Sequence, residues 1–176
     1  YKGLGEMQTL AGGVGDLKKV LTGVKTRGIW GEIQLGRLLG DTLAEGQYLE
    51  NTPVVPGSSE RVEFAVRLPG RDGAGLLLPI DSKFPLDAFR HLIDESETGD
   101  KARADKAALL LQRAVLDQAK KISEKYVKPP YTTDFALMFL PIESLYAEVM
   151  RRESLAEEAR VRFHVVIAGP STLSAL

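Results

Sequence analysis

The sequence predicts an α/β fold in which a central mixed β-sheet is flanked by helices. Two short strands at 61–68 and 76–83 are joined by a glycine-rich turn, which is typical of an antiparallel pair. The nearly continuous apolar run Phe135–Leu140 indicates an interior strand that is covered on both faces. A last strand is expected at 161–168, and helical segments separate these strands. This order favours a mixed sheet with helices on its faces.

Proline and polar residues mark the ends of the expected helices. Pro85 suits the first turn of a helix, and Pro129 with Pro130 stops one. The stretch from Asn51 to Ser59 contains two prolines, a glycine and two serines, and it is expected to be a loop. The expected helices are 29–44, 85–93, 101–127 and 144–158, with a further helix capped by residues 169–171.

Apolar residues near the start of the chain recur at alternating spacings of three and four. Such a seam is typical of a coiled coil or of a packed amphipathic helix, and both interpretations stay open. We therefore expect residues 1–27 to be the end of such a helix and residues 28–176 to be a core domain within a longer chain. The residues of the seam are Met7, Leu10, Val14, Leu17, Leu21 and Val24.

Length and composition bound the class of protein. The chain has 176 residues, of which 44% are hydrophobic and 27% charged, as in a soluble globular domain. The net charge of -1 gives no global attraction to nucleic acid or membrane, so any such affinity must come from a local patch. The absence of cysteine excludes disulfides and thiolate metal sites. We expect a cytoplasmic domain, with any membrane anchor of the parent protein lying upstream.

The two paired strands carry the candidate site. Side chains alternate between the faces of a strand, so the first strand has an apolar face and a face that carries Glu63. If Leu68 pairs with Leu76 across the turn, the same register places Glu63 directly opposite Asp81. Lys83 follows Asp81 by two residues and projects to the same side. The apolar face consists of Val62, Phe64, Val66 and Leu68.

Two facing carboxylates beside a lysine suit metal-dependent hydrolysis of a phosphodiester. Glu63 and Asp81 are the expected ligands of Mg²⁺ or Mn²⁺, and the backbone carbonyl of Ser82 is a plausible third. Lys83 is placed to contact the phosphate or to orient the attacking water. The alternative is an Asp81–Lys83 surface pair that contributes under about 1 kcal/mol, with Glu63 simply solvated.

Glu32 is a candidate fourth catalytic residue on the helix expected at 29–44. At 100° per residue, Leu39 and Leu43 lie within about 20° of Glu32, which would place this carboxylate in the middle of the apolar face. A carboxylate there is costly unless it is paired or binds a cation. The alternative is a buried glutamate paired with a nearby arginine.

The long helix expected at 101–127 is basic. A face that contacts the phosphates of a nucleic acid is one interpretation. A solvated helix surface is the other, because the basic positions do not form one stripe. The candidate nucleic-acid-binding residues are Lys120, Lys121, Lys125 and Lys128.

Four sequence blocks together resemble the RmuC family, the so-called DNA recombination proteins. They occur in the order of the family and cover nearly the whole chain: Gly28–Leu35, Ile80–Leu86, Met138–Glu143 and Pro170–Leu173. The resemblance implies a restriction-endonuclease-like core of the PD-(D/E)xK superfamily. Asp81 and Lys83 match its (D/E)xK element, and Glu32 matches the helical acid. This chain has Arg61-Val62-Glu63 where the family usually has Arg-Pro-Asp.

The resemblance implies a metal-dependent nuclease-like domain that is involved in DNA recombination and hydrolyses phosphodiester bonds. It also implies an upstream coiled coil, which agrees with the apolar seam and makes a homo-oligomer a reasonable expectation. DNA is the expected partner, and no membrane contact is expected from residues 1–176. The alternative is a non-catalytic DNA-binding or structural module that keeps the nuclease scaffold and assembles through the coiled coil.

Overall fold

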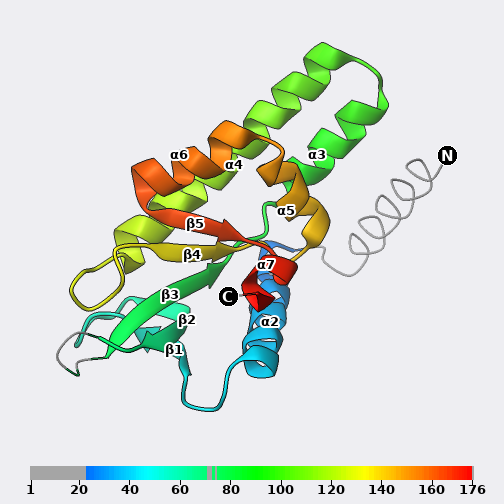
Figure 1. The fold of residues 1–176 in the computed structure, drawn as a ribbon. Coiled ribbons are helices and arrows are strands. Elements are labelled where there is room, and N and C mark those ends of the chain that lie inside the picture. Colours follow the sequence, from blue (N-terminus) through cyan, green and yellow to red (C-terminus); the bar gives the residue numbers. More distant parts are fainter. Residues whose placement is uncertain (1–22, 71–72, 74, 176) are drawn as a thin grey trace.

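A single five-stranded sheet organises the fold of this computed structural model, which describes residues 23–70, 73 and 75–175. The strands follow one another in the sheet in sequence order (Figure 1). The pairs β1–β2 and β2–β3 are antiparallel, whereas β3–β4 and β4–β5 are parallel. The predicted α/β class with a mixed sheet is confirmed. The strands are β1 (Tyr48–Pro53), β2 (Arg61–Leu68), β3 (Leu76–Ser82), β4 (Ala136–Phe139) and β5 (Val165–Ala168).

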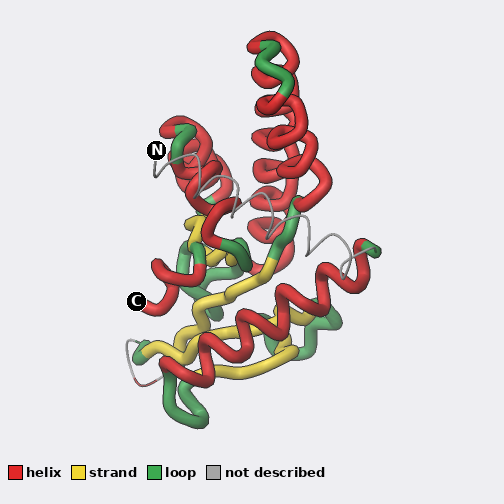
Figure 2. Tube along the Cα trace, turned by 90° about the vertical axis from the view of Figure 1, so that its right-hand side faces the viewer, coloured by secondary structure: helices red, strands yellow, loops and turns green. Residues whose placement is uncertain are grey.

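Helices cover both faces of the sheet, as Figure 2 shows. One face carries α2 (Val24–Thr42) and α7 (Pro170–Ser174), and their buried leucines pack with Phe64 and Ile80. The helices on the other face bury a larger cluster that includes Ala65 and Met138. These helices are α3 (Leu86–Glu97), α4 (Lys101–Tyr126), α5 (Glu143–Met150) and α6 (Glu153–Phe163). The core is therefore divided into two apolar layers, with the sheet between them.

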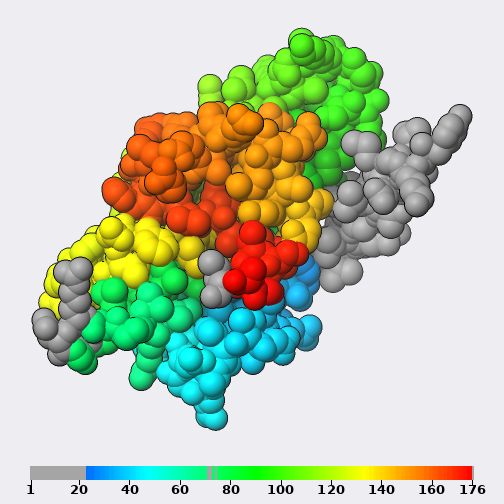
Figure 3. Space-filling view, in the orientation of Figure 1, coloured from blue at the N-terminus to red at the C-terminus, as the bar shows by residue number. Residues whose placement is uncertain are grey.

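The α3–α4 pair extends beyond the sheet and forms one end of the molecule (Figures 1 and 3). Asp100 caps the start of α4, because its carboxylate accepts hydrogen bonds from the backbone N–H groups of Ala102 and Arg103 at 3.0 and 3.2 Å. The far end of α4 returns to the sheet, where the Tyr126 hydroxyl donates to the Arg61 carbonyl at 3.1 Å. The last turns of α4 are thereby held beside the start of β2.

Strand β1 was not expected, and the predicted loop 51–59 is wrong for its first three residues. Asn51, Thr52 and Pro53 belong to β1, which pairs with β2 alone at the edge of the sheet. An edge strand tolerates polar residues and proline because one of its sides makes no ladder hydrogen bonds. Its composition therefore resembles that of a loop.

The single helix predicted at 144–158 is in fact two helices, α5 and α6. In one continuous helix, Leu155 would lie about 80° around the axis from Leu145 and about 120° from Val149. All three side chains are buried, so the chain turns at Arg151 and Arg152 to bring both stripes onto the core.

The last strand begins later than predicted. Residues 161–163 still belong to α6, which ends at His164 with a left-handed φ of 54°. β5 therefore starts at Val165, and the predicted strand 161–168 is wrong for its first four residues. An apolar run this short does not distinguish the end of a helix from the start of a strand.

Val62 departs from the predicted face. Phe64 packs on the α2 side of the sheet, but Val62, which simple alternation places on the same face, packs into the cluster on the other face. Asn51, which the β1–β2 register places opposite Glu63, has a left-handed φ of 43°, so the regular pleat is interrupted beside Val62.

The apolar seam from Met7 to Leu21 lies outside the described residues, and only its last member, Val24, is seen, at the beginning of α2. Within residues 23–70, 73 and 75–175, no helix is both long and apolar enough to span a bilayer.

Candidate functional site

Glu63 and Asp81 meet across the β2–β3 pair. The predicted register is confirmed, because Leu68 pairs with Leu76 and the ladder runs to Phe64 opposite Ile80. The next position in the same register places Glu63 opposite Asp81. The Glu63 Oε2 atom accepts a hydrogen bond from the backbone N–H of Ser82 at 2.8 Å. The first carboxylate is thus fixed to the end of β3.

Asp81 and Lys83 form an ion pair at this end of β3. The Asp81 residue is 3% exposed, and its Oδ2 atom lies 2.5 Å from the Lys83 Nζ atom. The Lys83 backbone N–H donates to the Phe139 carbonyl at 2.9 Å. The chain therefore stays paired with β4 for one residue beyond the end of β3. Extended backbone keeps alternate side chains on one side, which is why the lysine reaches the aspartate. The lysine side chain itself is 30% exposed and remains accessible to a ligand.

Both carboxyl groups hold their protons more tightly than usual. The pKa of Glu63 is raised from 4.5 to about 7, chiefly by burial and then by the charge of Asp81. The Ser82 N–H and the Lys83 ammonium oppose this rise. Burial also raises the pKa of Asp81, and Lys83 and Lys125 counteract part of that effect. Burial is the largest cause of both shifts, and a cation bound at the two carboxylates would favour their charged forms.

Glu32 lies at the rim of the site and not in the middle of the apolar face of α2, so that expectation is wrong. The buried residues of α2 are Gly31, Leu35 and Leu39, and Glu32 is exposed. A Cβ atom on Gly31 would lie 2.5 Å from the Ser82 Oγ atom, so the helix approaches β3 most closely through this glycine. The predicted apolar face of this helix consisted of large side chains and did not include Gly31. Because Gly31 is buried, the buried face of α2 is rotated away from Glu32.

The charge of Glu32 nevertheless acts on the site, because it contributes to the raised pKa of Glu63. In the part of the chain that the structure describes, no group of three or more acidic or histidine side chains is arranged to hold a metal ion. Glu32 therefore does not join Glu63 and Asp81 in a three-acid cluster. Its catalytic role stays a prediction.

A small cavity opens between the ion pair and the last turns of α4. Its volume is about 140 Å³, and Lys121 and Lys125 lie one helical turn apart in its wall. Lys125 also lies 3.6 Å from a Glu60 carboxylate oxygen. The full lining consists of Asp81, Lys83, Gln118, Lys121, Ile122, Lys125 and Tyr126. The structure thus separates the four predicted lysines, because Lys120 and Lys128 do not line this cavity.

Three further lining residues, Gln118, Ile122 and Tyr126, are not among the predicted site residues. They share one helix face at spacings of four, and this spacing was the available signal. Tyr126 is 8% exposed, and burial followed by the charges of Asp81 and Glu60 raises its pKa to about 12. It is a neutral anchor that sets the position of the basic wall.

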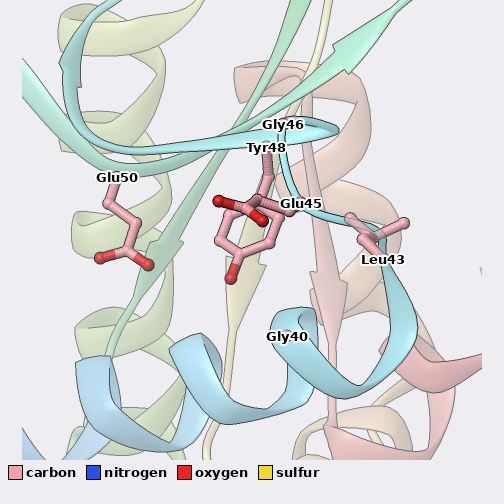
Figure 4. A pocket seen from close by; sticks show the side chains of 6 residues that line it. All are labelled: Gly40, Leu43, Glu45, Gly46, Tyr48 and Glu50. Atoms are coloured by element: carbon pink, nitrogen blue, oxygen red, sulfur yellow. The ribbon is translucent and has the colours of Figure 1, made fainter.

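A larger cavity of about 290 Å³ lies elsewhere, between the end of α2 and β1 (Figure 4). Its lining consists of Gly40, Leu43, Glu45, Gly46, Tyr48 and Glu50. The cavity contains none of the predicted site residues and no basic side chain. Size alone therefore does not identify the site, and the facing carboxylates with Lys83 remain the candidate.

Fold and site together define an α/β domain with two facing carboxylates and a lysine at one end of a mixed sheet. The chain belongs to the RmuC family, whose family model matches residues 1–176. Curated relatives carry the name "DNA recombination protein RmuC homolog". The protein from Xylella fastidiosa strain Temecula1 is 52% identical over 177 residues, and the one from Chlamydia pneumoniae is 30% identical over 162 residues.

These relatives are much longer than the present chain. The alignments cover 99% of this chain but 39% of the Xylella protein, and 91% of this chain but 36% of the Chlamydia protein. A protein of Pseudomonas aeruginosa with the same name is 27% identical over 164 residues, with coverages of 91% and 35%. No solved structure matches the chain.

Proposed function

We propose that this domain is a metal-dependent phosphodiesterase that acts on DNA. One observation carries the proposal: Glu63 and Asp81 face each other across β2 and β3, and Lys83 contacts the second carboxylate. Hydrolysis of a phosphodiester needs positive charge beside the developing negative charge and a group that orients the attacking water. These three side chains supply groups of both kinds.

The residues present fit Mg²⁺ or Mn²⁺. Mg²⁺ is usually held by one or two carboxylates together with water and phosphate oxygens. Glu63 and Asp81 would hold the ion, with the Ser82 carbonyl as a predicted further ligand. A bound ion would supply an activated water and charge stabilisation at the phosphate. The raised pKa values of both carboxyl groups support this fit, because burial disfavours their charged forms and a bound cation would favour them.

Lys83 has one role in this proposal, and Lys121 and Lys125 have another. Lys83 is partly exposed and lies at the carboxylates, so its ammonium can contact the scissile phosphate. Lys121 and Lys125 form the cavity wall and would bind neighbouring phosphates of the strand. DNA is proposed as the polymer because the named relatives are called DNA recombination proteins.

A second function is a non-catalytic module that binds DNA on the same scaffold. The observation that favours it is the short contact between Lys83 and Asp81, because such a pair neutralises the aspartate without a metal ion. This module would bind DNA with an affinity that falls as salt rises, but it would not hydrolyse it. Assembly through a coiled coil would involve residues 1–27, of which 1–22 lie outside the described part.

Calorimetry with Mg²⁺ or Mn²⁺, with and without DNA, tests the proposal on the wild type and on Asp81→Ala. Wild-type protein should bind the ion, at least with DNA present, and should cut DNA, and Asp81→Ala should do neither. Asp117→Ala is the matched control, because Asp117 is exposed on α4 and does not line the cavity. DNA binding without recruitment of metal and without cleavage would establish the non-catalytic function.

A further inference from the structure

An aromatic pair stands beside the candidate site. The ring centroids of Trp30, on α2, and Phe84 lie 5.6 Å apart in an edge-to-face arrangement with an interplanar angle of 76°. Phe84 directly follows Lys83 in the chain. Gly31, which follows Trp30, packs against Ser82. Both rings are therefore held at the end of β3 that carries Asp81 and Lys83.

Trp30 lies in an apolar surface of α2 that is open to solvent. Both rings are half-buried, but Phe84 packs against the larger buried cluster, whereas Trp30 belongs to neither of the two clusters of the described chain. Two large apolar neighbours on α2 remain well exposed, Ile29 at 49% and Ile33 at 47%. Trp30 and Ile33 are three residues apart and so are neighbours on one helix surface.

Two further lysines, Lys121 and Lys125, lie near Lys83 in the cavity that faces α4. The cavity that Lys83 shares with Lys121 and Lys125 faces α4, whereas the Trp30–Phe84 pair is contributed by α2 and the segment after β3. A strand whose phosphates follow the basic wall to Lys83 would bring its next base toward the two rings. Backbone charge and aromatic rings in this order are the features of a surface that binds unpaired nucleic acid.

We propose that Trp30 and Phe84 bind an unpaired base, so that the substrate of the site is single-stranded DNA or the frayed end of a duplex. The choice of DNA as the polymer rests on the proposed function. A base inside a duplex already stacks on both neighbours and cannot cover an aromatic side chain without leaving the stack. The surface thus selects strands whose bases are free.

Intrinsic fluorescence gives a direct test, because Trp30 is the only tryptophan among the 176 residues. The protein is titrated in EDTA, which prevents metal-dependent cleavage, with an oligothymidylate of roughly ten nucleotides. Stacking of a base on the indole should quench its emission. A blunt, GC-rich duplex of the same length should quench less at equal saturation.

Variants separate stacking from general binding. Trp30→Leu should weaken binding of the labelled oligothymidylate on the order of tenfold in fluorescence anisotropy, whereas Trp30→Phe should retain most of the affinity. Phe84→Leu removes the second aromatic ring of the pair and should also weaken binding. Tyr131→Leu is the matched control, because Tyr131 is 48% exposed and lies at the other end of β3, where its carbonyl accepts from Leu77. Circular dichroism checks that each variant is folded.

The outcomes distinguish this inference from the proposed function. Anisotropy that shows binding while the emission of Trp30 stays constant would overturn the stacking surface. Equal affinities of the wild type and folded Trp30→Leu would do the same, even if the protein cuts DNA. Quenching without any cleavage that depends on Asp81 would support the stacking surface and remove the phosphodiesterase. If Trp30→Leu does not fold, the quenching experiment and Phe84→Leu still decide.

Discussion

The Nζ atom of Lys83 lies 2.5 Å from the Oδ2 atom of Asp81, and only the lysine reaches the solvent, with a side chain that is 30% exposed against 4% for the aspartate. Lys83 therefore stabilises the charged form of the aspartate against the effect of its burial. A ligand that approaches from the solvent meets the lysine first. In the proposed function, Lys83 would exchange the aspartate for a phosphate once a bound metal ion neutralises Asp81.

Lys83→Met should destabilise the metal-free protein at pH 8, because it leaves the buried Asp81 charge without a partner. The expected loss is about 1–3 kcal/mol, less than for a fully buried pair since the lysine is partly exposed. Urea denaturation measures it. The loss should shrink as the pH falls, because protonation of the aspartate removes its unpaired charge and burial already raises its pKa.

The double variant Asp81→Asn with Lys83→Met provides the control for that experiment. It removes both charges and should recover most of the stability at pH 8. A double variant as unstable as Lys83→Met alone would show that the lysine acts through packing of its aliphatic chain and not through its charge.

Glu63 should make the metal-free protein less stable as pH rises. Its pKa is raised from 4.5 to about 7 in the folded state, so between these values the folded protein binds more protons than the unfolded chain. Stability then falls with increasing pH across this interval, by roughly 3 kcal/mol at most. Urea midpoints of the wild type and Glu63→Gln between pH 4.5 and 8 measure the effect.

The difference between these two proteins isolates Glu63, because His91 and His164 are common to both. Glu63→Gln should flatten the profile, and Glu50→Gln, which removes an exposed carboxylate on β1, should leave it unchanged. Parallel profiles for the wild type and Glu63→Gln would contradict the raised pKa.

Gly31→Ala should destabilise the fold by about 1–3 kcal/mol, because the new methyl group would lie 2.5 Å from the Ser82 Oγ atom. Gly28→Ala is the matched control, since its Cβ would meet no atom within 4 Å. That substitution should instead stabilise α2 by up to about 1 kcal/mol. Thermal unfolding followed by circular dichroism compares the two variants.

Ser82→Ala should rescue Gly31→Ala, because the next contact of the new methyl group, with the Ser82 Cβ atom, is an ordinary 3.6 Å. A double variant that is no more stable than Gly31→Ala would show that the clash involves the backbone of β3.

Lys121→Gln and Lys125→Gln should each weaken DNA binding at low salt and reduce its salt dependence. Loss of one phosphate contact should make the negative slope of log K against log salt shallower by roughly 0.7–0.9. Lys120→Gln is the matched control, because Lys120 lies on the same helix but outside the cavity, with its Nζ atom 3.9 Å from Glu124. An equal effect of all three variants would indicate a diffuse basic surface.

Local sequence patterns were sufficient to predict the β2–β3 hairpin and the facing of its two carboxylates. The register from Leu68 and Leu76 depends on the alternation of side chains and on one turn, so the facing of Glu63 and Asp81 could be predicted. The long helix α4 begins at the predicted Lys101 and ends one residue before the predicted end, because capping and proline signals lie next to it in the chain. The family resemblance added the interpretation of these residues as a nuclease-like centre, and membership in the family is confirmed.

Other features depended on contacts between distant segments. Glu32 was placed on the wrong part of α2, because the approach of Gly31 to Ser82 sets the rotation of that helix. The break between α5 and α6 serves the burial of Leu155 against the core. Neither contact leaves a local signal in the sequence.

The sequence by itself determined the class of fold, the family, and the two carboxylates and lysine of one hairpin, because these follow from periodicity and from residues close together in the chain. Only the tertiary structure decided which lysines of α4 face Asp81, where Glu32 lies, and that Trp30 meets Phe84 beside Lys83. The physical reason is that the rotation of a helix against a sheet is set by packing over its whole buried face. A single glycine with no side chain can change that rotation.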